Sequence, residues 1–107
     1  MIHYMKLRTD PFERIKSGKK KIEIRLYDEK RKLVKVSDEI EFTNLENNEK
    51  IKVRVKKIHR FDTFKDLFDY FDESYFGSTS HDYKKMYDYY SKEEENTYGV
   101  VGIEIKL

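Results

Sequence analysis

The sequence predicts an α+β fold, a small β-barrel of about five or six strands with peripheral helices. Three observations lead to this class. About five segments alternate apolar and polar residues, as strands with one buried face do. Between them, apolar residues recur at helical spacing. The strands and helices do not alternate regularly along the 107 residues, as a parallel α/β sheet would require.

The strand segments are separated by recognisable turns. Asn47-Asn48 indicates a hairpin turn. Lys57-Ile58 breaks the alternation of the strand before it, which indicates a bulge or bend. The residues expected on the buried face of the five strands are Met5 and Leu7; Ile22, Ile24 and Leu26; Ile40 and Phe42; Ile51, Val53 and Val55; and Val101, Ile103, Ile105 and Leu107.

A short helix is expected after the first strand, Tyr4–Arg8. Asp10 is suited to cap it and Pro11 to occupy its first position. Phe12 and Ile15 would form its apolar face. Gly18 is placed to end it in the left-handed conformation that glycine adopts without steric cost.

Further helices are expected in the C-terminal half. Phe64, Leu67, Phe68 and Phe71 recur at helical spacing, and so do Tyr83, Met86, Tyr87 and Tyr90. The segment Glu73–Ser80 is expected to be a loop between them. Ser91-Lys92-Glu93-Glu94 is a capping-box pattern, with Gly99 as the stop of that last short helix.

Composition excludes several classes of protein. There is no cysteine, so disulfides and thiolate metal sites are excluded. Dispersed His3, His59 and His81 lack metal-ligand spacing, and no P-loop or dinucleotide fingerprint is present, so neither metal nor cofactor is expected. No segment has the roughly 20 apolar residues of a membrane span. We expect one cytoplasmic domain over residues 1–107, monomeric by default.

Charge is distributed unevenly along the chain. Met1–Phe61 holds 18 Lys and Arg against 10 Asp and Glu, a balance of +8, whereas Asp62–Gly99 holds 4 against 10, a balance of −6. A polyanionic partner for the N-terminal half would explain this asymmetry. Mutual attraction of the two halves within one fold would explain it equally well.

Residues 18–25 read Gly-Lys-Lys-Lys-Ile-Glu-Ile-Arg and match a G-x-K-x-x-E-x-R signature. A strand and a helix precede this motif, a V-x-x-D-E-I-E-F segment follows it, and residues 89–103 form a characteristic ending. On these features the chain resembles the ASCH family over essentially its whole length. The resemblance implies a small barrel similar to the RNA-binding PUA domain.

The resemblance also implies a range of functions. ASCH domains have been proposed to bind RNA, with the motif lining a cleft beside the barrel. One bacterial branch deacetylates N4-acetylcytidine with a Lys and a Thr of the motif and a distal Glu, and other members have been linked to RNA cleavage. This chain has Glu23 at the position of that Thr. If it is an enzyme, Lys20 and Glu23 are the expected catalytic pair, with a distal carboxylate from Glu93, Glu94 or Glu95.

Lys20, Glu23 and Arg25 are the leading ligand-binding candidates, with Gly18 shaping the turn before them. Arginine offers a planar fork for phosphate or a base edge, and a carboxylate can orient it or accept from a base amino group. A surface ion pair of Glu23 and Arg25 is the plain alternative. Strict alternation also places Lys20 opposite Glu23, so the strand must begin after Lys20. Arg25→Ala is expected to abolish binding with little loss of stability.

Other residues are candidates for a wider surface. Lys6 and Arg8 would extend the basic site from the preceding strand, and Tyr98 or Tyr27 could stack on a base. Lys52, Arg54 and Lys56 form a basic strand face that is either a rim or simply solvated. The expected partner is RNA or a nucleotide-like ligand. A protein-interaction module that uses the acidic, Tyr-rich segment 62–99 is a further alternative.

Overall fold

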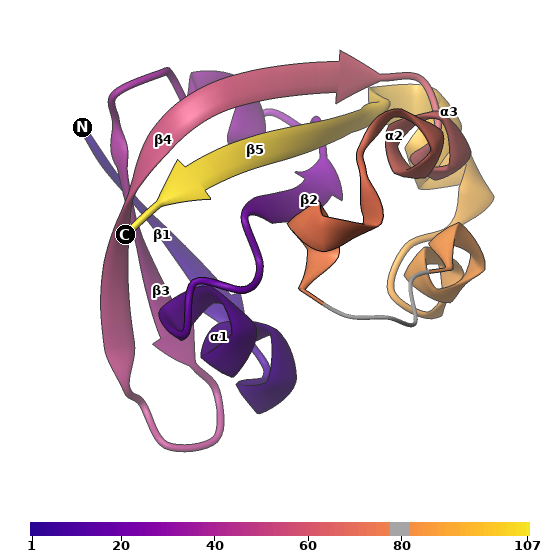
Figure 1. Ribbon diagram of the computed structural model, residues 1–107. Coiled ribbons are helices and arrows are strands. Elements are labelled where there is room, and N and C mark those ends of the chain that lie inside the picture. The colour runs from indigo at the N-terminus through magenta and orange to yellow at the C-terminus, as the bar shows by residue number, and fades with distance from the viewer. Residues whose placement is uncertain (78–81) are drawn as a thin grey trace.

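The computed structural model describes residues 1–77 and 82–107 and places five strands in one curled sheet (Figure 1). The strands lie in the order β1-β3-β4-β5-β2. β1 and β3 run parallel, and the other neighbours are antiparallel. The half-barrel with peripheral helices confirms the predicted class. The strand bounds are β1 (Ile2–Leu7), β2 (Ile22–Leu26), β3 (Glu39–Asn44), β4 (Lys50–Phe61) and β5 (Val100–Lys106).

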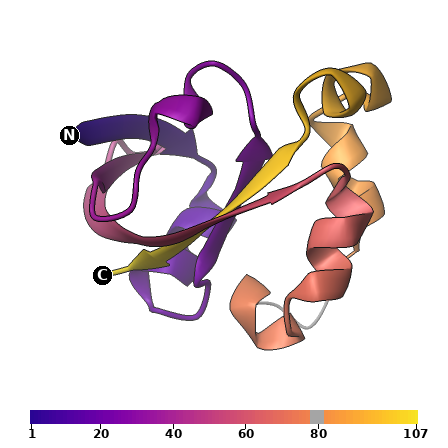
Figure 2. The same cartoon turned by 90° about the horizontal axis from the view of Figure 1, so that it is seen from above.

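The three α-helices lie at two places around the sheet. α1 packs beside β1 and β3, whereas α2, η3 and α3 gather at the far ends of β4 and β5 (Figures 1 and 2). The α-helices are α1 (Thr9–Lys16), α2 (Phe64–Tyr70) and α3 (Lys92–Tyr98), and the 3-10 helices are η1 (Arg31–Leu33), η2 (Glu73–Phe76) and η3 (Tyr83–Asp88).

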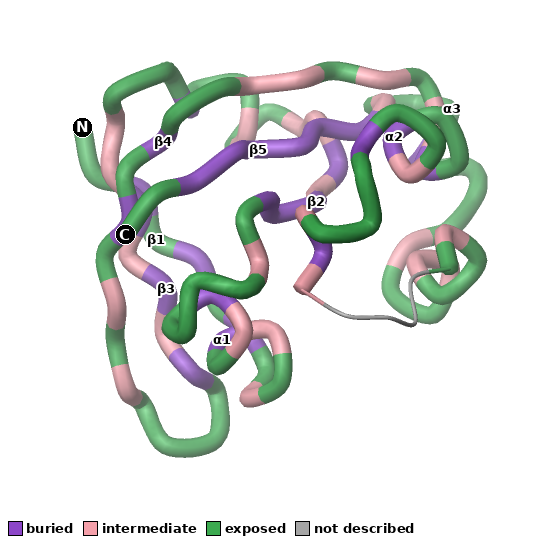
Figure 3. Tube along the Cα trace, in the orientation of Figure 1, coloured by how far each residue is buried: buried purple, intermediate pink, exposed green. Residues whose placement is uncertain are grey.

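Two apolar cores lie on opposite faces of β5. Ile22, Ile24 and Leu26 pack with residues of α2 and η2 in one core. The other core fills the curl of the sheet and includes Val101 and Ile103 of β5. β5 therefore lies between the two cores and is buried along almost its whole length (Figure 3).

The register of β2 against β5 decides where the motif side chains go. Glu23 lies opposite Ile103, and Arg25 lies opposite Val101. Directly opposed residues of an antiparallel pair share a face. Glu23 and Arg25 therefore face the inside of the curl, on the side of the core that contains Val101 and Ile103.

Several local predictions are confirmed. The register of β4 against β5 shifts between Val55 and Lys57, at the predicted bulge. Ser91 and Glu94 form the capping box of α3. Gly18 has a φ of 81°, in the left-handed region.

The predicted start of the first helix is wrong. α1 begins at Thr9 with Arg8 as its N-cap, and no side chain caps it. Asp10 lies within the first turn instead. The Thr9 hydroxyl donates to the carboxylate of Glu46 at 2.6 Å, which holds the helix start against the turn that follows β3.

Two further predictions need correction. Leu107 lies beyond the end of β5 and is 62% exposed, because the last pair of the ladder joins Lys106 to Arg54. The expected loop Glu73–Ser80 begins with η2, whose Phe76 is buried, and its residues 78–80 lie outside the described residues.

The second of the predicted C-terminal helices is a 3-10 helix without a fully buried residue. The four apolar or aromatic side chains of the predicted helix nevertheless pack half-buried against the core of α2 and β2. These side chains are Tyr83, Met86, Tyr87 and Tyr90.

Candidate functional site

The turn between α1 and β2 places Lys20 beside Glu23. The Lys20 N–H donates to the Arg14 carbonyl oxygen at 2.9 Å, so Lys20 still belongs to the turn, and the strand begins at Ile22. This resolves the conflict with strict alternation in the predicted way. A methyl group on Gly77 would come within 2.8 Å of the Lys20 nitrogen. The end of η2 is thus packed directly against this turn.

Glu23 is the buried centre of the motif. Its side chain is 3% exposed. One carboxylate oxygen accepts from Lys20 Nζ at 3.1 Å, and the other accepts from Arg25 Nε at 3.0 Å and Nη2 at 2.8 Å. Burial raises the pKa of Glu23, but the charges of Lys20 and Arg25 outweigh it and hold this pKa below its usual range. The carboxylate is therefore ionised at neutral pH.

Arg25 reaches from β2 to the opposite edge of the sheet. Its Nη2 also donates to the main-chain oxygen of Lys6 in β1 at 3.0 Å. Burial alone would lower the pKa of the guanidinium, but Glu23 raises it above its ordinary value. Within the described residues, Arg25 Nη1 makes no hydrogen bond and remains available as a donor.

Lys6 and Arg8 extend this region in different ways. Lys6 contributes its carbonyl oxygen, while its side chain lies on the exposed face of β1. The Arg8 guanidinium lies over the ring of Tyr89, 5.5 Å from the centroid. Burial raises the pKa of the next residue, Tyr90, whose hydroxyl also experiences the charges of Arg25 and Glu23. Sequence reasoning assigned Tyr90 to packing and gave Tyr89 no role of its own.

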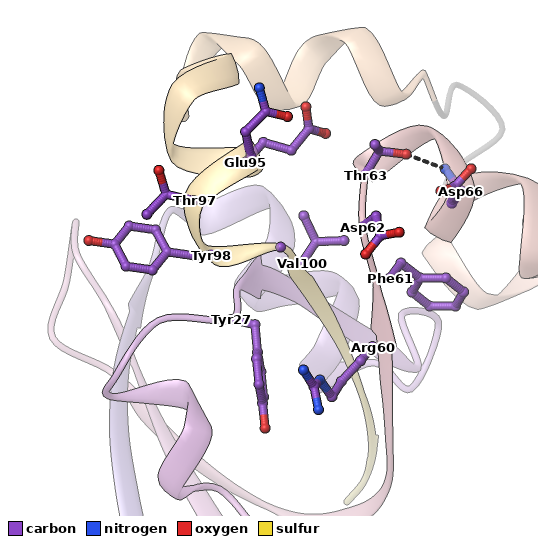
Figure 4. Close-up of a pocket in the computed structure, with 12 residues that line it drawn as sticks. Tyr27, Arg60, Phe61, Asp62, Thr63, Asp66, Glu95, Thr97, Tyr98 and Val100 are labelled. Carbon is purple, nitrogen blue, oxygen red and sulfur yellow. Dashed lines mark hydrogen bonds between the residues drawn. The ribbon is translucent and has the colours of Figure 1, made fainter.

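Tyr98 is separated from the motif. It lines a hollow of about 660 Å³ at the ends of β4 and β5, together with Tyr27 and Arg60 (Figure 4). Lys20, Glu23 and Arg25 do not line this hollow. Sequence reasoning had placed Tyr98 with the motif and had missed Arg60. The available signal was the spacing of Arg60 and Asp62, two residues apart between the predicted fourth strand and the next helix.

The basic face of β4 is balanced by its neighbour. Lys52 lies opposite Glu41 of β3, and Arg54 lies opposite Glu39. Opposite charges on facing residues of an antiparallel pair stabilise the sheet modestly. Together with exposed Lys56, these residues therefore form a mixed, solvated face, away from Glu23.

Two of the three distal glutamates, Glu94 and Glu95, form hydrogen bonds within the helical part of the structure. Glu94 accepts from the Ser91 N–H in the capping box. Glu95 accepts from the Phe64 N–H at 2.7 Å and from the Tyr87 hydroxyl. Glu93 is exposed on α3. No hydrogen bond between described residues joins any of the three to the motif.

The histidines do not converge. His3 bonds Asp38 at 2.8 Å, and His59 bonds Glu104 at 2.5 Å, while His81 lies outside the described residues. Over residues 1–77 and 82–107, no group of three His, Asp or Glu side chains is arranged to hold a metal ion. In the same part of the chain no helix is long and apolar enough to cross a membrane.

A curled five-stranded sheet with peripheral helices and a charged motif on its edge strand is the architecture of a PUA-like barrel. Residues 5–107 match the sequence profile of the ASCH domain. The chain belongs to the ASCH domain family.

Solved structures of similar proteins agree with this assignment. The hypothetical protein PH0355 is 37% identical, with a TM-score of 0.87 over 99% of this chain and 98% of that one. Protein PF0455 from Pyrococcus furiosus is also 37% identical, with a TM-score of 0.76 over 99% and 96%. ASCH from Zymomonas mobilis is 15% identical, with a TM-score of 0.72 over 99% and 67%, and shares the fold. No curated protein matches the sequence.

Proposed function

We propose that this chain binds RNA or a nucleotide-like ligand through the site of Lys20, Glu23 and Arg25, with Gly18 shaping the turn. The observation that carries the proposal is the buried carboxylate of Glu23, held ionised between two cations. A buried ion cluster is a poor source of stability, because desolvation offsets the attraction between its charges. Its value lies in fixing the geometry of the two cations.

The remaining donors suit an anionic ligand. The cluster of two cations and one carboxylate has a net charge of +1. Glu23 occupies Arg25 Nε and Nη2 and one direction of Lys20 Nζ, which leaves Arg25 Nη1 and further Nζ protons for phosphate or base oxygens. Arg8, the residue after β1, carries a further cation, which lies over the ring of Tyr89. Pre-organised donors of this kind lose little conformational entropy when a ligand binds.

The geometry favours binding over hydrolysis by Lys20 and Glu23. A general base works best when its pKa lies near the working pH. Glu23 has a lowered pKa, and both of its carboxylate oxygens accept hydrogen bonds. It therefore holds the two cations in place and is poorly suited to act as a base. The alternative activity has a direct test. Release of cytidine from N4-acetylcytidine, stopped by Lys20→Ala, would replace binding with hydrolysis.

Amide NMR spectra recorded during titration with short single-stranded RNAs, and then with cytidine nucleosides, test the proposal. We expect shifts at Gly18, Lys20, Glu23 and Arg25, and an affinity that falls as salt rises. Arg25→Lys keeps the charge but loses the planar fork, so it should weaken binding.

Lys65→Ala is the matched control, because it removes one cation from the exposed face of α2. It should leave the affinity for RNA unchanged. If both variants lowered the affinity for RNA equally, the effect would be explained by the overall charge of the protein. A spectrum that no ligand of the panel changes would overturn the proposal.

A further inference from the structure

A second polar hollow lies apart from the motif, where the end of β4, the residue after β2 and the end of α3 meet. Its volume is about 660 Å³, enough for a nucleoside, and it is open to solvent. Figure 4 shows the side chains around it. The charged groups that line it are the guanidinium of Arg60 and the carboxylates of Asp62, Asp66 and Glu95. Of these, Glu95 already accepts hydrogen bonds from Phe64 and Tyr87.

Arg60 is a positioned donor in this hollow. Its guanidinium lies 4.3 Å from the centroid of the Tyr27 ring, a cation–π contact that fixes its place without using its N–H groups. Tyr27 is itself held by a hydrogen bond from its N–H to the Gly99 oxygen at 3.0 Å. Within the described residues, Arg60 forms no side-chain hydrogen bond and no ion pair.

Asp62 is the complementary acceptor. It is the first residue after β4, two positions beyond Arg60, and both residues line the hollow. Its carboxylate is exposed and accepts no hydrogen bond from the described residues. An unpaired donor fork and an unpaired acceptor therefore flank the same space.

Tyr98 lies at the rim of the hollow. It is 40% exposed at the last position of α3, and its ring points away from Arg60 and Asp62 (Figure 4). The ligand is therefore defined by Arg60 and Asp62. A ligand that fits both has a pair of acceptors at one edge and a pair of donors at the next.

We propose that this hollow is a binding site for a guanine base. Guanine presents O6 and N7 as a pair of acceptors for an arginine fork. Its adjacent N1–H and N2–H groups form a pair of donors for a carboxylate. Adenine has one acceptor and one donor at the edge that an arginine would read, and uracil has no amino group. Cytosine has a single amino group for the carboxylate. Guanine alone among the four satisfies both charged groups with two hydrogen bonds each.

The inference does not depend on the motif site, although the two sites are near each other. Arg25, Val101 and Arg60 lie in one row across β2, β5 and β4. Strands in a sheet are about 4.8 Å apart, so the two arginines start from backbone positions roughly 10 Å apart. A guanine in the hollow could therefore belong to a strand that also reaches Arg25, or to a free nucleotide.

The test is amide NMR titration with GMP, AMP, CMP and UMP, which carry the same phosphate and differ only in the base. We expect GMP to shift the amides of Arg60, Asp62 and Tyr98 and to bind about tenfold more tightly than the other three, the size of one good bidentate contact. Asp62→Asn should remove most of this preference, because the amide nitrogen cannot accept from N1–H. Asp69→Asn, on the exposed face of α2, is the matched control and should leave it unchanged.

Arg60→Gln should also weaken GMP binding, and a thermal melt checks that loss of the Tyr27 contact has not unfolded the chain. Asp62→Asn does not disturb that contact and keeps the test valid if Arg60→Gln is unstable. Equal affinities for all four nucleotides, or shifts confined to Gly18–Arg25, would overturn the proposal.

An oligonucleotide arm separates the two sources of the base. UUGUU binding more tightly than GMP, with the same loss in Asp62→Asn, would support guanine within an RNA strand. GMP binding as tightly as UUGUU would support a free guanine nucleotide. If Arg25→Lys weakens RNA but not GMP, the two sites act independently, and failure of either proposal can be recognised by itself.

Discussion

The side chain of Arg25 joins the two edge strands of the sheet through the carbonyl oxygen of Lys6, at 3.0 Å. β2 and β1 stand at opposite ends of the strand order, and no backbone ladder connects them. The same guanidinium holds Glu23. Arg25, which the sequence suggests as a ligand group or as half of a surface ion pair, thus also helps to close the half-barrel.

Removal of this side chain should destabilise the protein. Arg25→Ala would leave the buried Glu23 carboxylate with Lys20 as its only described partner and free the Lys6 carbonyl. We expect the free energy of unfolding to fall by about 1–3 kcal/mol, the cost of leaving a buried polar group unsatisfied. Urea denaturation measures it. This replaces the sequence-based expectation of little loss of stability.

The control for Arg25→Ala is Lys65→Ala, which breaks an exposed pair with Asp69. Such pairs contribute little, so its effect should stay within about 0.5 kcal/mol. A loss for Arg25→Ala no larger than that of Lys65→Ala would show that the contact with Lys6 does not stabilise the half-barrel.

The stability of the protein should fall in acid because of Glu23. Its pKa lies below the ordinary 4.5, since the charges of Lys20 and Arg25 outweigh the effect of burial. The unfolded chain therefore takes up this proton at higher pH than the folded chain. The stabilisation is complete above about pH 5 and is lost as pH falls through the folded-state pKa. Unfolding free energies measured from pH 7 to pH 3 should show this decline.

Glu23→Gln should flatten that decline, because the amide does not titrate. Some slope should remain, since the hydrogen bond from His3 also lowers the pKa of Asp38. Asp69→Asn, at an exposed site, should leave the profile close to that of the wild type. An unchanged slope in Glu23→Gln would mean that Glu23 does not carry the acid sensitivity.

Much of the fold was predictable because its signals are local. The bulge after Val55 and the capping box at Ser91 are set by residues within a few positions of each other. The start of α1 was not, because the Thr9 hydroxyl bonds Glu46, 37 residues away. The prediction that Leu107 is buried was wrong for a related reason. Alternation shows which face of a strand a residue takes, but not where the neighbouring strand ends.

The candidate site was likewise predictable only in its local part. The motif spacing placed Lys20, Glu23 and Arg25 together, and the structure joins them by hydrogen bonds. Burial of Glu23 could not be predicted, because it depends on the register of β2 against β5, which is about 80 residues further along the chain. The contact of Arg60 with Tyr27 likewise joins residues 33 positions apart.

Two glycines beside the motif provide a matched comparison. Gly18 and Gly77 both have positive φ, at 81° and 68°. A methyl group at Gly18 would meet no atom within 4 Å, whereas at Gly77 it would come within 2.8 Å of the Lys20 nitrogen. Gly18→Ala should therefore lose only about 1–2 kcal/mol, the cost of the left-handed conformation. Gly77→Ala should lose more, because the backbone of the turn must also move.

Chemical denaturation and the amide shift of Lys20 measure these two effects. Gly77→Ala should displace the Lys20 resonance, and Gly18→Ala should change it less, although Gly18 is closer in sequence. Equal losses of stability with an undisturbed Lys20 amide in Gly77→Ala would argue against close packing of η2 on the motif turn.

Glu95 should prove to be a structural residue of the helical side. Its side chain is 4% exposed and accepts hydrogen bonds from the Phe64 N–H and the Tyr87 hydroxyl, so it ties α3 to the first residue of α2 and to η3. Burial and this hydrogen bond raise the pKa of Tyr87 to about 12. Glu95→Ala should lower the free energy of unfolding by about 2 kcal/mol, within the range for hydrogen bonds to charged groups.

Glu93→Ala, two positions earlier on the exposed face of α3, is the matched control and should change little. Tyr87→Phe removes only the hydroxyl and should lose about 1 kcal/mol. Because the Tyr87 hydroxyl donates to the carboxylate of Glu95, the double variant should lose less than the sum of the two single variants. Strict additivity would mean that the hydroxyl and the carboxylate stabilise the protein separately, and Glu95 would then be free to act elsewhere.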